Sequence, residues 1–226
     1  FTTSSAGLIN GSTSCTLALN ATTITNSLFM YQTTVGTINA IKFFTLNSAG
    51  QTLTLGNNLV AYTGGTYTHT NGIVNLNGKT LTLNGSISFA SAIANGSYTG
   101  SSASSISIGG STAGTITNSL LMTQTSSSTN SLSSLVLNRN TKTLTLGNAL
   151  NVIDIICPNS GTLAGGGNIT LVADKITVGH VGRIGRVGGS ITGNITSQVY
   201  HNPPPGNTTN WMLMGAPIAP AERLDS

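Results

Sequence analysis

Acidic side chains supply much of the acid–base and calcium chemistry of enzymes. The sequence of 226 residues contains four of them: Asp154, Asp174, Glu222 and Asp225. Asp154 and Asp174 are twenty residues apart, a spacing that could stack them on neighbouring turns of a repeating fold. Two carboxylates do not make a calcium cage, and Asp174 next to Lys175 is interpreted as a surface ion pair. The sequence therefore predicts no catalytic carboxylate site.

The histidines and cysteines give no clearer metal or nucleophile site. His69, His180 and His201 are scattered, whereas zinc ligation requires close spacing or a partnering carboxylate, so we interpret them as packed or solvated side chains. Cys15 and Cys157 are too few for a disulfide framework or a zinc site, and whether they pair stays open. The G-x-S-x-G motif of a nucleophile elbow does not occur in the sequence. We expect a protein that is not an enzyme and that uses no metal and no cofactor.

A glycine-rich segment, "GHVGRIGRVGG" at 179–189, has spaced glycines like those of phosphate-binding loops. It lacks the G-K-[ST] ending and the following helix that such loops require. We interpret it as one turn of the fold, with its apolar residues inward and Arg183 and Arg186 outward. These two arginines are the candidate contacts for an anionic surface glycan.

Composition narrows the class of protein. Charged residues make up 5% of the chain, against about 25% in an ordinary globular domain, and the net charge is only +4. Nucleic-acid binders concentrate many more cations on one face, so no nucleic-acid partner is predicted. No apolar run reaches the roughly 18 residues of a membrane-spanning helix. Abundant Thr, Ser, Asn and Gly suit an extracellular or cell-surface β structure that hydroxyls and amides solvate.

The sequence repeats itself. "TITNSLFMYQT" at 23–33 returns as "TITNSLLMTQT" at 115–125, and "TLTLGN" at 52–57 returns at 143–148. A third "TLTL" occurs at 80–83. Repetition on this scale indicates a solenoid, an array or a propeller. We divide the chain into solenoid unit one (1–95), solenoid unit two (96–192), and a C-terminal strand with a Pro-rich docking tail (193–226).

The repeated segment predicts strands. In Thr52-Leu53-Thr54-Leu55 the leucines point one way and the threonines the other, which is the period of a β-strand. Gly-Asn, Asn-Gly and Gly-Gly between such strands favour tight corners, and no segment has a helical period. We predict a right-handed parallel β-helix with an extended C-terminal tail, in which Leu53, Leu81 and Leu144 lie directly above one another. Two tandem β-sandwich repeats are the alternative.

Residues 144–218 contain three stretches with a family resemblance. "GGNITLVAD" (166–174), "GGSITGNITSQVYHNPPP" (188–205) and "WMLMGAPI" (211–218) resemble segments of very large surface proteins that gliding and related Gram-negative bacteria export by the type IX secretion route. His201 departs from that pattern, which has arginine there. The upstream turns resemble filamentous-haemagglutinin-like repeats. The resemblance implies a secreted, cell-surface-associated β-solenoid with an adhesive or structural role.

The tail differs in composition from the rest. It holds five of the six prolines and the only tryptophan. It either folds back as a cap or docks on a neighbouring subunit, and docking repeated without closure produces a fibre. The candidate docking residues are Pro203, Pro204, Pro205, Trp211, Met212, Leu213, Met214 and Ile218.

The leading hypothesis is a non-enzymatic extracellular structural protein, a subunit of a cell-surface filament or adhesive fibre assembled head to tail as a homo-oligomer. The alternatives are a monomeric adhesin module that binds glycan or another surface, and a polysaccharide-cleaving β-helix enzyme.

Overall fold

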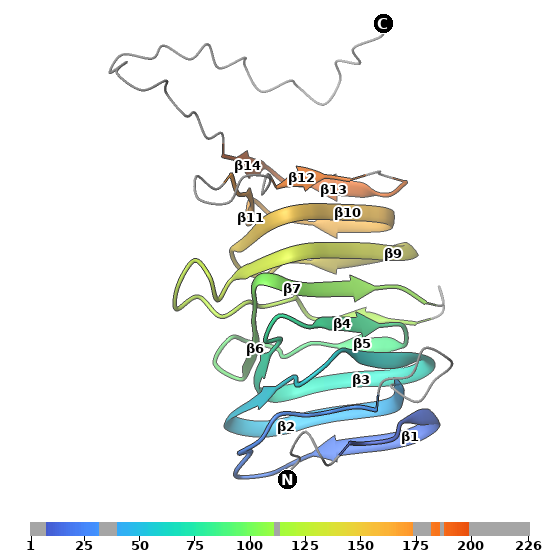
Figure 1. Ribbon diagram of the computed structural model, residues 1–226. Helices are drawn as coiled ribbons and strands as arrows, with labels where there is room; N and C mark the ends of the chain where they lie inside the picture. Colours follow the sequence, from blue (N-terminus) through green and yellow to red (C-terminus); the bar gives the residue numbers. More distant parts are fainter. Residues whose placement is uncertain (1–7, 32–39, 111–113, 174–181, 186–187, 199–226) are drawn as a thin grey trace, which may run out of the picture.

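A computed structural model describes residues 8–31, 40–110, 114–173, 182–185 and 188–198. Within these ranges the chain is all-β and contains no helix. Stacked coils of parallel strands form a β-solenoid of about seven turns. In Figure 1 the turns follow one another in chain order, from β1 beside the N-terminus to β12–β14 at the other end.

The strands of the described part vary widely in length. In chain order they are β1 (Ser12–Leu19), β2 (Ala40–Thr54), β3 (Leu59–Asn75), β4 (Thr80–Leu83), β5 (Ser86–Ser88), β6 (Gly96–Thr99), β7 (Ser101–Ile108), β8 (Ile116–Thr117), β9 (Ser131–Thr145), β10 (Leu150–Ala164), β11 (Ile169–Leu171), β12 (Arg183–Ile184), β13 (Ser190–Thr192) and β14 (Ile195–Ser197). The long strands β2, β3, β9 and β10 bend around corners of the coil (Figure 1).

Strand pairing defines the architecture. All pairings between the described strands are parallel, and the main path runs β1-β2-β3-β4-β7-β9-β10-β11-β14. A β-sandwich would instead consist of two antiparallel sheets, so the tandem-sandwich alternative is wrong and the parallel β-helix is confirmed. The pairing also continues past residue 95, because β3 pairs with β6 and β4 pairs with β7. The two repeat units therefore share one stack.

The core forms as the alternation predicts. In β4, Leu81 and Leu83 are fully buried while Thr80 and Thr82 are only half-buried. Such buried leucines belong to one continuous apolar cluster along the stack. Burying one leucine stabilises a fold by about 1.5–3 kcal/mol, and no single coil can bury its own apolar face. Stacking of coils is therefore what makes the fold stable.

One prediction about the core is wrong. Leu53, Leu81 and Leu144 do not lie above one another. The register pairs Leu53 with Val74, Leu81 with Leu59 and Ile106, and Leu144 with Leu163. The three "TLTL" segments thus belong to three different ladders. A ladder requires an apolar side chain of fitting size at each level, not the same segment at each level.

The longer repeat does appear in the structure. β2 and β9 both have 15 residues, and their burial patterns differ only at the fourth and last positions. These strands start 91 residues apart in the chain, the same offset as the two "TLTLGN" segments. The repeated segment therefore marks equivalent places in two units of several turns each. No helix of the described ranges is long and apolar enough to cross a membrane.

Candidate functional site

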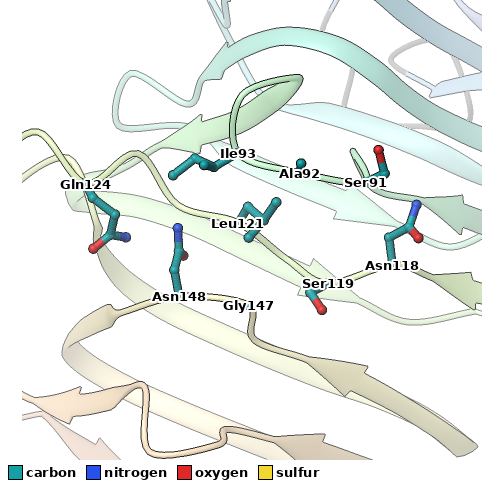
Figure 2. Close-up of a pocket in the computed structure, with 9 residues that line it drawn as sticks. All are labelled: Ser91, Ala92, Ile93, Asn118, Ser119, Leu121, Gln124, Gly147 and Asn148. Carbon is teal, nitrogen blue, oxygen red and sulfur yellow. The ribbon is translucent and has the colours of Figure 1, made fainter.

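A cavity of about 430 Å³ opens on the side of the stack, where three segments from successive turns meet (Figure 2). The first segment is the loop between β5 and β6, which contributes Ser91, Ala92 and Ile93. The second is residues 118–124, between β8 and β9, and the third is the corner between β9 and β10 at 147–148. The size lies within the range of about 300–1,000 Å³ that is typical of small-molecule sites.

The upper wall is a tight turn. The backbone N–H groups of Asn95 and Gly96 donate to Ala92 O at 3.0 and 3.1 Å, and Asn95 Nδ2 donates to Ser91 Oγ at 2.9 Å. These bonds close the loop and place Ile93 at its tip, where 49% of its surface is exposed. An isoleucine this exposed supplies apolar contact area at the mouth of the cavity.

Two amide side chains fix the lower wall. Asn148 Oδ1 accepts from the backbone N–H of Met122 at 2.8 Å, and Asn148 Nδ2 donates to Met122 O at 2.7 Å. Gln124 Nε2 donates to Met122 O at 3.1 Å and to Ala149 O at 2.9 Å. The amides connect neighbouring turns through backbone groups, so the wall is held in place before any ligand arrives.

The apolar floor depends on a glycine. A Cβ added at Gly147 would lie 2.6 Å from Leu121 Cδ2 and 2.9 Å from Ser119 Cβ. Real Cβ atoms do not approach other heavy atoms this closely. Glycine at 147 therefore lets Leu121 lie against the backbone of the next turn, where it lines the cavity beside Ile93 (Figure 2).

Three polar groups in the cavity retain hydrogen-bonding capacity. Asn118 Nδ2 donates to Phe89 O at 2.7 Å, which leaves its Oδ1 as an acceptor. Ser119 forms no side-chain hydrogen bond with the described part of the chain, and the Ser91 hydroxyl, which accepts from Asn95, retains its proton for donation. None of the nine lining residues is charged. The site can bind a neutral polar molecule but offers no acid, base or nucleophile pair.

Two further cavities are formed by the described residues. One of about 420 Å³ is lined largely by hydroxyls, with five serines among its nine residues, and includes Ser102 and Ser128. A smaller one of about 220 Å³ is lined by four glycines and three polar residues. The 420 Å³ cavity also has two apolar side chains, Ile153 and Val172, but both are half-buried, whereas the first cavity has Ile93 with 49% of its surface exposed. The smallest cavity has no apolar side chain. No cluster of three His, Cys, Asp or Glu that could hold a metal ion occurs within the ranges that the structure describes.

The arginine proposed to contact glycan already has a partner. Arg183 lies in β12, and its Nη1 is 3.0 Å from Asp154 Oδ1. Both side chains are largely exposed, at 60% and 42%, so the pair contributes no more than about 1 kcal/mol. A glycan contact of Arg183 stays a prediction, and Arg186 lies outside the described residues.

Most other sequence-predicted groups also lie outside the described residues. These are Asp174, Lys175, His180, His201, Pro203, Pro204, Pro205, Trp211, Met212, Leu213, Met214, Ile218, Glu222 and Asp225. Tail docking and the stacking of Asp154 on Asp174 therefore stay predictions. Cys15 lies in β1 and Cys157 in β10, and no disulfide joins them.

His69 is a packed side chain, one of the two interpretations that the sequence left open. It is buried, its Nε2 lies 2.7 Å from Gly72 O, and its ring meets Tyr98 edge-on at 5.1 Å. Burial lowers the pKa of the imidazole below its ordinary value, while the bond to Gly72 O opposes that shift. The ring is therefore neutral at pH 7 and belongs to an aromatic cluster in the core.

Sequence reasoning missed one buried charge, Arg139. Its side chain is fully buried in β9; Nε donates to Gly109 O at 3.0 Å and Nη2 to Leu83 O at 3.1 Å. Burial lowers the pKa of the guanidinium. The arginine joins its own turn to two preceding turns, which makes it a structural residue. The sequence distinguishes Arg139 in one respect only: the equivalent position of unit one holds a small residue, Ser48.

Fold and cavity together define a β-solenoid that carries an uncharged surface site. No protein-family model, curated protein or solved structure matches the chain.

Proposed function

We propose that this protein is a non-enzymatic extracellular building block, a subunit that assembles head to tail into a cell-surface filament. The supporting observation is that the apolar ladders are less well buried at the two ends of the described stack. Within the described ranges, five of the six partly buried apolar residues that pack against the core lie at these ends: Ile9, Leu17 and Ile24 in the first turn, and Ile191 and Ile195 in the last. The sixth, Ile116, lies in β8. Interior levels such as Leu81 are fully buried.

The strand edges support the same proposal. Among the described strands, β1 pairs only with β2, and β14 pairs only with β11. No other described strand pairs with the outer edge of either terminal turn, so within the described ranges these edges carry backbone donors and acceptors in parallel register. Such edges template further pairing. The end of a second copy offers a complementary edge and apolar layer, and head-to-tail contacts that do not close generate a fibre.

The extracellular, cell-surface location rests on composition and on the family resemblance. A chain with only 5% charged residues and many hydroxyl and amide side chains suits that setting. The Pro-rich tail that follows the C-terminal strand within 193–226 is proposed to dock on the neighbouring subunit and strengthen the end-to-end contact. Adhesion would then be a property of the assembled fibre.

Light scattering over a concentration series, with negative-stain electron microscopy, tests the assembly. The parent protein is expected to form unbranched fibres. Leu17→Lys places a charge in the exposed end layer and is expected to give monomers with an unchanged circular dichroism spectrum. Thr143→Lys, on the exposed side of a mid-stack strand, is the matched control and should still assemble. A parent protein that stays monomeric at every concentration contradicts the proposal.

A further inference from the structure

We infer that the cavity between the 91–93 loop and Leu121 is a binding site for a neutral saccharide. This inference does not depend on filament formation, because the cavity lies on the side of the stack and is formed by residues of one chain (Figure 2). It would make the protein a glycan-binding solenoid whether or not the ends assemble.

Charge selects the ligand class. All nine lining residues are uncharged, and the polar ones are two serines, two asparagines and one glutamine. An ionic ligand entering this site would lose hydration without meeting an opposite charge, which is unfavourable. A neutral molecule that carries many hydroxyls loses hydration too, but here it regains hydrogen bonds to hydroxyl and amide groups.

Shape and polarity fit a sugar ring. Ile93 and Leu121 give the cavity an apolar surface, while Ser91, Asn118 and Ser119 supply polar atoms around it (Figure 2). A pyranose has an apolar face of C–H groups and a rim of hydroxyls, each of which donates and accepts. The Asn118 carbonyl oxygen accepts, the Ser91 hydroxyl retains a proton to donate, and the Ser119 hydroxyl does both.

The site is also preorganised. The side chains of Asn148 and Gln124 already bond to backbone groups of Met122, and the Asn95 side chain already bonds to Ser91. A ligand therefore does not have to order these walls, and the entropic cost of binding falls. Preorganisation matters here because an open, uncharged site has no ion pair to supply affinity.

A peptide fits less well than a saccharide. Peptides that bind to β structure usually add a strand and need unpaired backbone groups. In the floor of this cavity those groups are occupied: Leu120 N–H donates to Thr145 O, Thr123 N–H to Tyr98 O, and Leu121 O accepts from Tyr98 N–H. A peptide therefore cannot pair with these backbone groups of residues 120–123 as an added strand. It would have to be recognised through its side chains.

The test is isothermal titration calorimetry with a glycan array, using the full 226-residue chain in the Leu17→Lys background so that assembly does not interfere. The probes are neutral oligosaccharides of hexoses and N-acetylhexosamines, sulfated and sialylated oligosaccharides, and an uncharged peptide of Ser, Asn and Leu. Neutral oligosaccharides are expected to bind. Ser119→Asp, which puts a charge into the cavity, is expected to weaken binding at least about tenfold.

Two further variants separate site from fold. Leu121→Phe enlarges the apolar surface and is expected to tighten saccharide binding, because an aromatic face packs well on C–H groups. Ser102→Asp, in the serine-lined cavity, is the matched control and should leave binding unchanged. The inference is overturned if only anionic sugars or the peptide bind, if no neutral probe binds, or if Ser119→Asp and Ser102→Asp weaken binding equally. The circular dichroism spectrum of each variant verifies that the variant is folded.

Discussion

The corners at Ser48 and Arg139 occupy the same place in the two repeat units, 91 residues apart, and both side chains point into the stack. Ser48 Oγ donates to Leu19 O at 3.0 Å and accepts from Ala21 N–H at 3.1 Å. Arg139 donates to carbonyl groups as well, but reaches across two turns. This corner is therefore defined by the backbone groups that need hydrogen-bond partners, and side chains of very different size can supply those partners.

The surface site gives a second comparison between the units. In unit one the ring of Phe29 lies on Gly56, where a Cβ would come within 2.5 Å of it, as Leu121 lies on Gly147 in unit two. Asn57 brackets the backbone of Met30 just as Asn148 brackets that of Met122. In both units the glycine leaves room for an apolar side chain of the preceding turn, and the asparagine bonds to the backbone of that turn. The apolar side chain itself is aromatic in unit one and aliphatic in unit two.

The largest expected effect comes from removing the buried guanidinium. Arg139→Met keeps the apolar stem but deprives Gly109 O of its donor, so we expect the free energy of unfolding to fall by about 2–3 kcal/mol. Ser48→Ala, at the equivalent corner, is expected to cost about 1–2 kcal/mol. Urea unfolding followed by circular dichroism measures both, with Arg139→Lys as an intermediate variant.

An unchanged or higher free energy of unfolding of Arg139→Met also has a physical basis. Bringing a guanidinium out of water is costly, and replacing buried ions by apolar residues sometimes stabilises a protein. If Arg139→Met is neutral or stabilising while Ser48→Ala is not, the two corners are not equivalent in energy. Arg139 would then be retained for a reason other than stability.

Alternation made the ladder-forming side chains predictable, but not their partners. Two-residue periodicity alone predicts that the leucines of each "TLTL" segment face the core, and in the segment at 80–83 both Leu81 and Leu83 are fully buried. Partners depend on the length of each turn: 21 residues separate Leu53 from Val74, whereas 25 separate Leu81 from Ile106. Corner loops absorb these differences, and a single sequence does not reveal where each corner ends.

The candidate site was not predictable for a related reason. Its three segments come from three turns and are far apart in the chain, and no motif connects Ile93 with Leu121 or Gly147. The repeat at 115–125 indicated a shared structure but not a cavity. Arg139 was equally hidden, because nothing in "LVLNRN" distinguishes an inward arginine at a corner from an outward one.

Acid is expected to lower the free energy of unfolding by an intermediate amount. The cause is a buried histidine that unit one has at a level of the ladder where unit two has proline. His69 pairs with Leu46 in the ladder, while the equivalent level of unit two pairs Pro158 with Leu137. Burial lowers the pKa of His69 in the folded state below the ordinary value of 6.5. Below about pH 6.5 the imidazole of the unfolded chain therefore binds a proton more readily than the imidazole of the folded chain. Stability should therefore be complete above about pH 6.5 and should decrease as the pH falls towards the folded-state pKa, by up to about 1.4 kcal/mol per pH unit.

The control is His69→Gln, which keeps a donor for Gly72 O but does not titrate. Urea unfolding at pH 7.5, 6.5, 5.5 and 4.5 should show a smaller decrease for the variant than for the parent. Every other titrating group is present in both proteins, so the difference reports on His69. Equal decreases would mean that this imidazole does not contribute to acid sensitivity.

The smallest change in the free energy of unfolding is expected when glycine and threonine are exchanged between two equivalent turns. These turns follow the corners at Ser48 and Arg139. Gly50 has φ +70° and Thr141, its equivalent, has φ +61°, a region that disfavours β-branched residues. Thr141→Gly should therefore raise the free energy of unfolding by about 1 kcal/mol, and Gly50→Thr should lower it by about 1–2 kcal/mol. A Cβ at Gly50 would have no neighbour within 4 Å, so that variant measures backbone strain without steric conflict. Both changes are measured by urea unfolding; a stability loss in Thr141→Gly would show that the exposed threonine contributes more than its backbone strain costs.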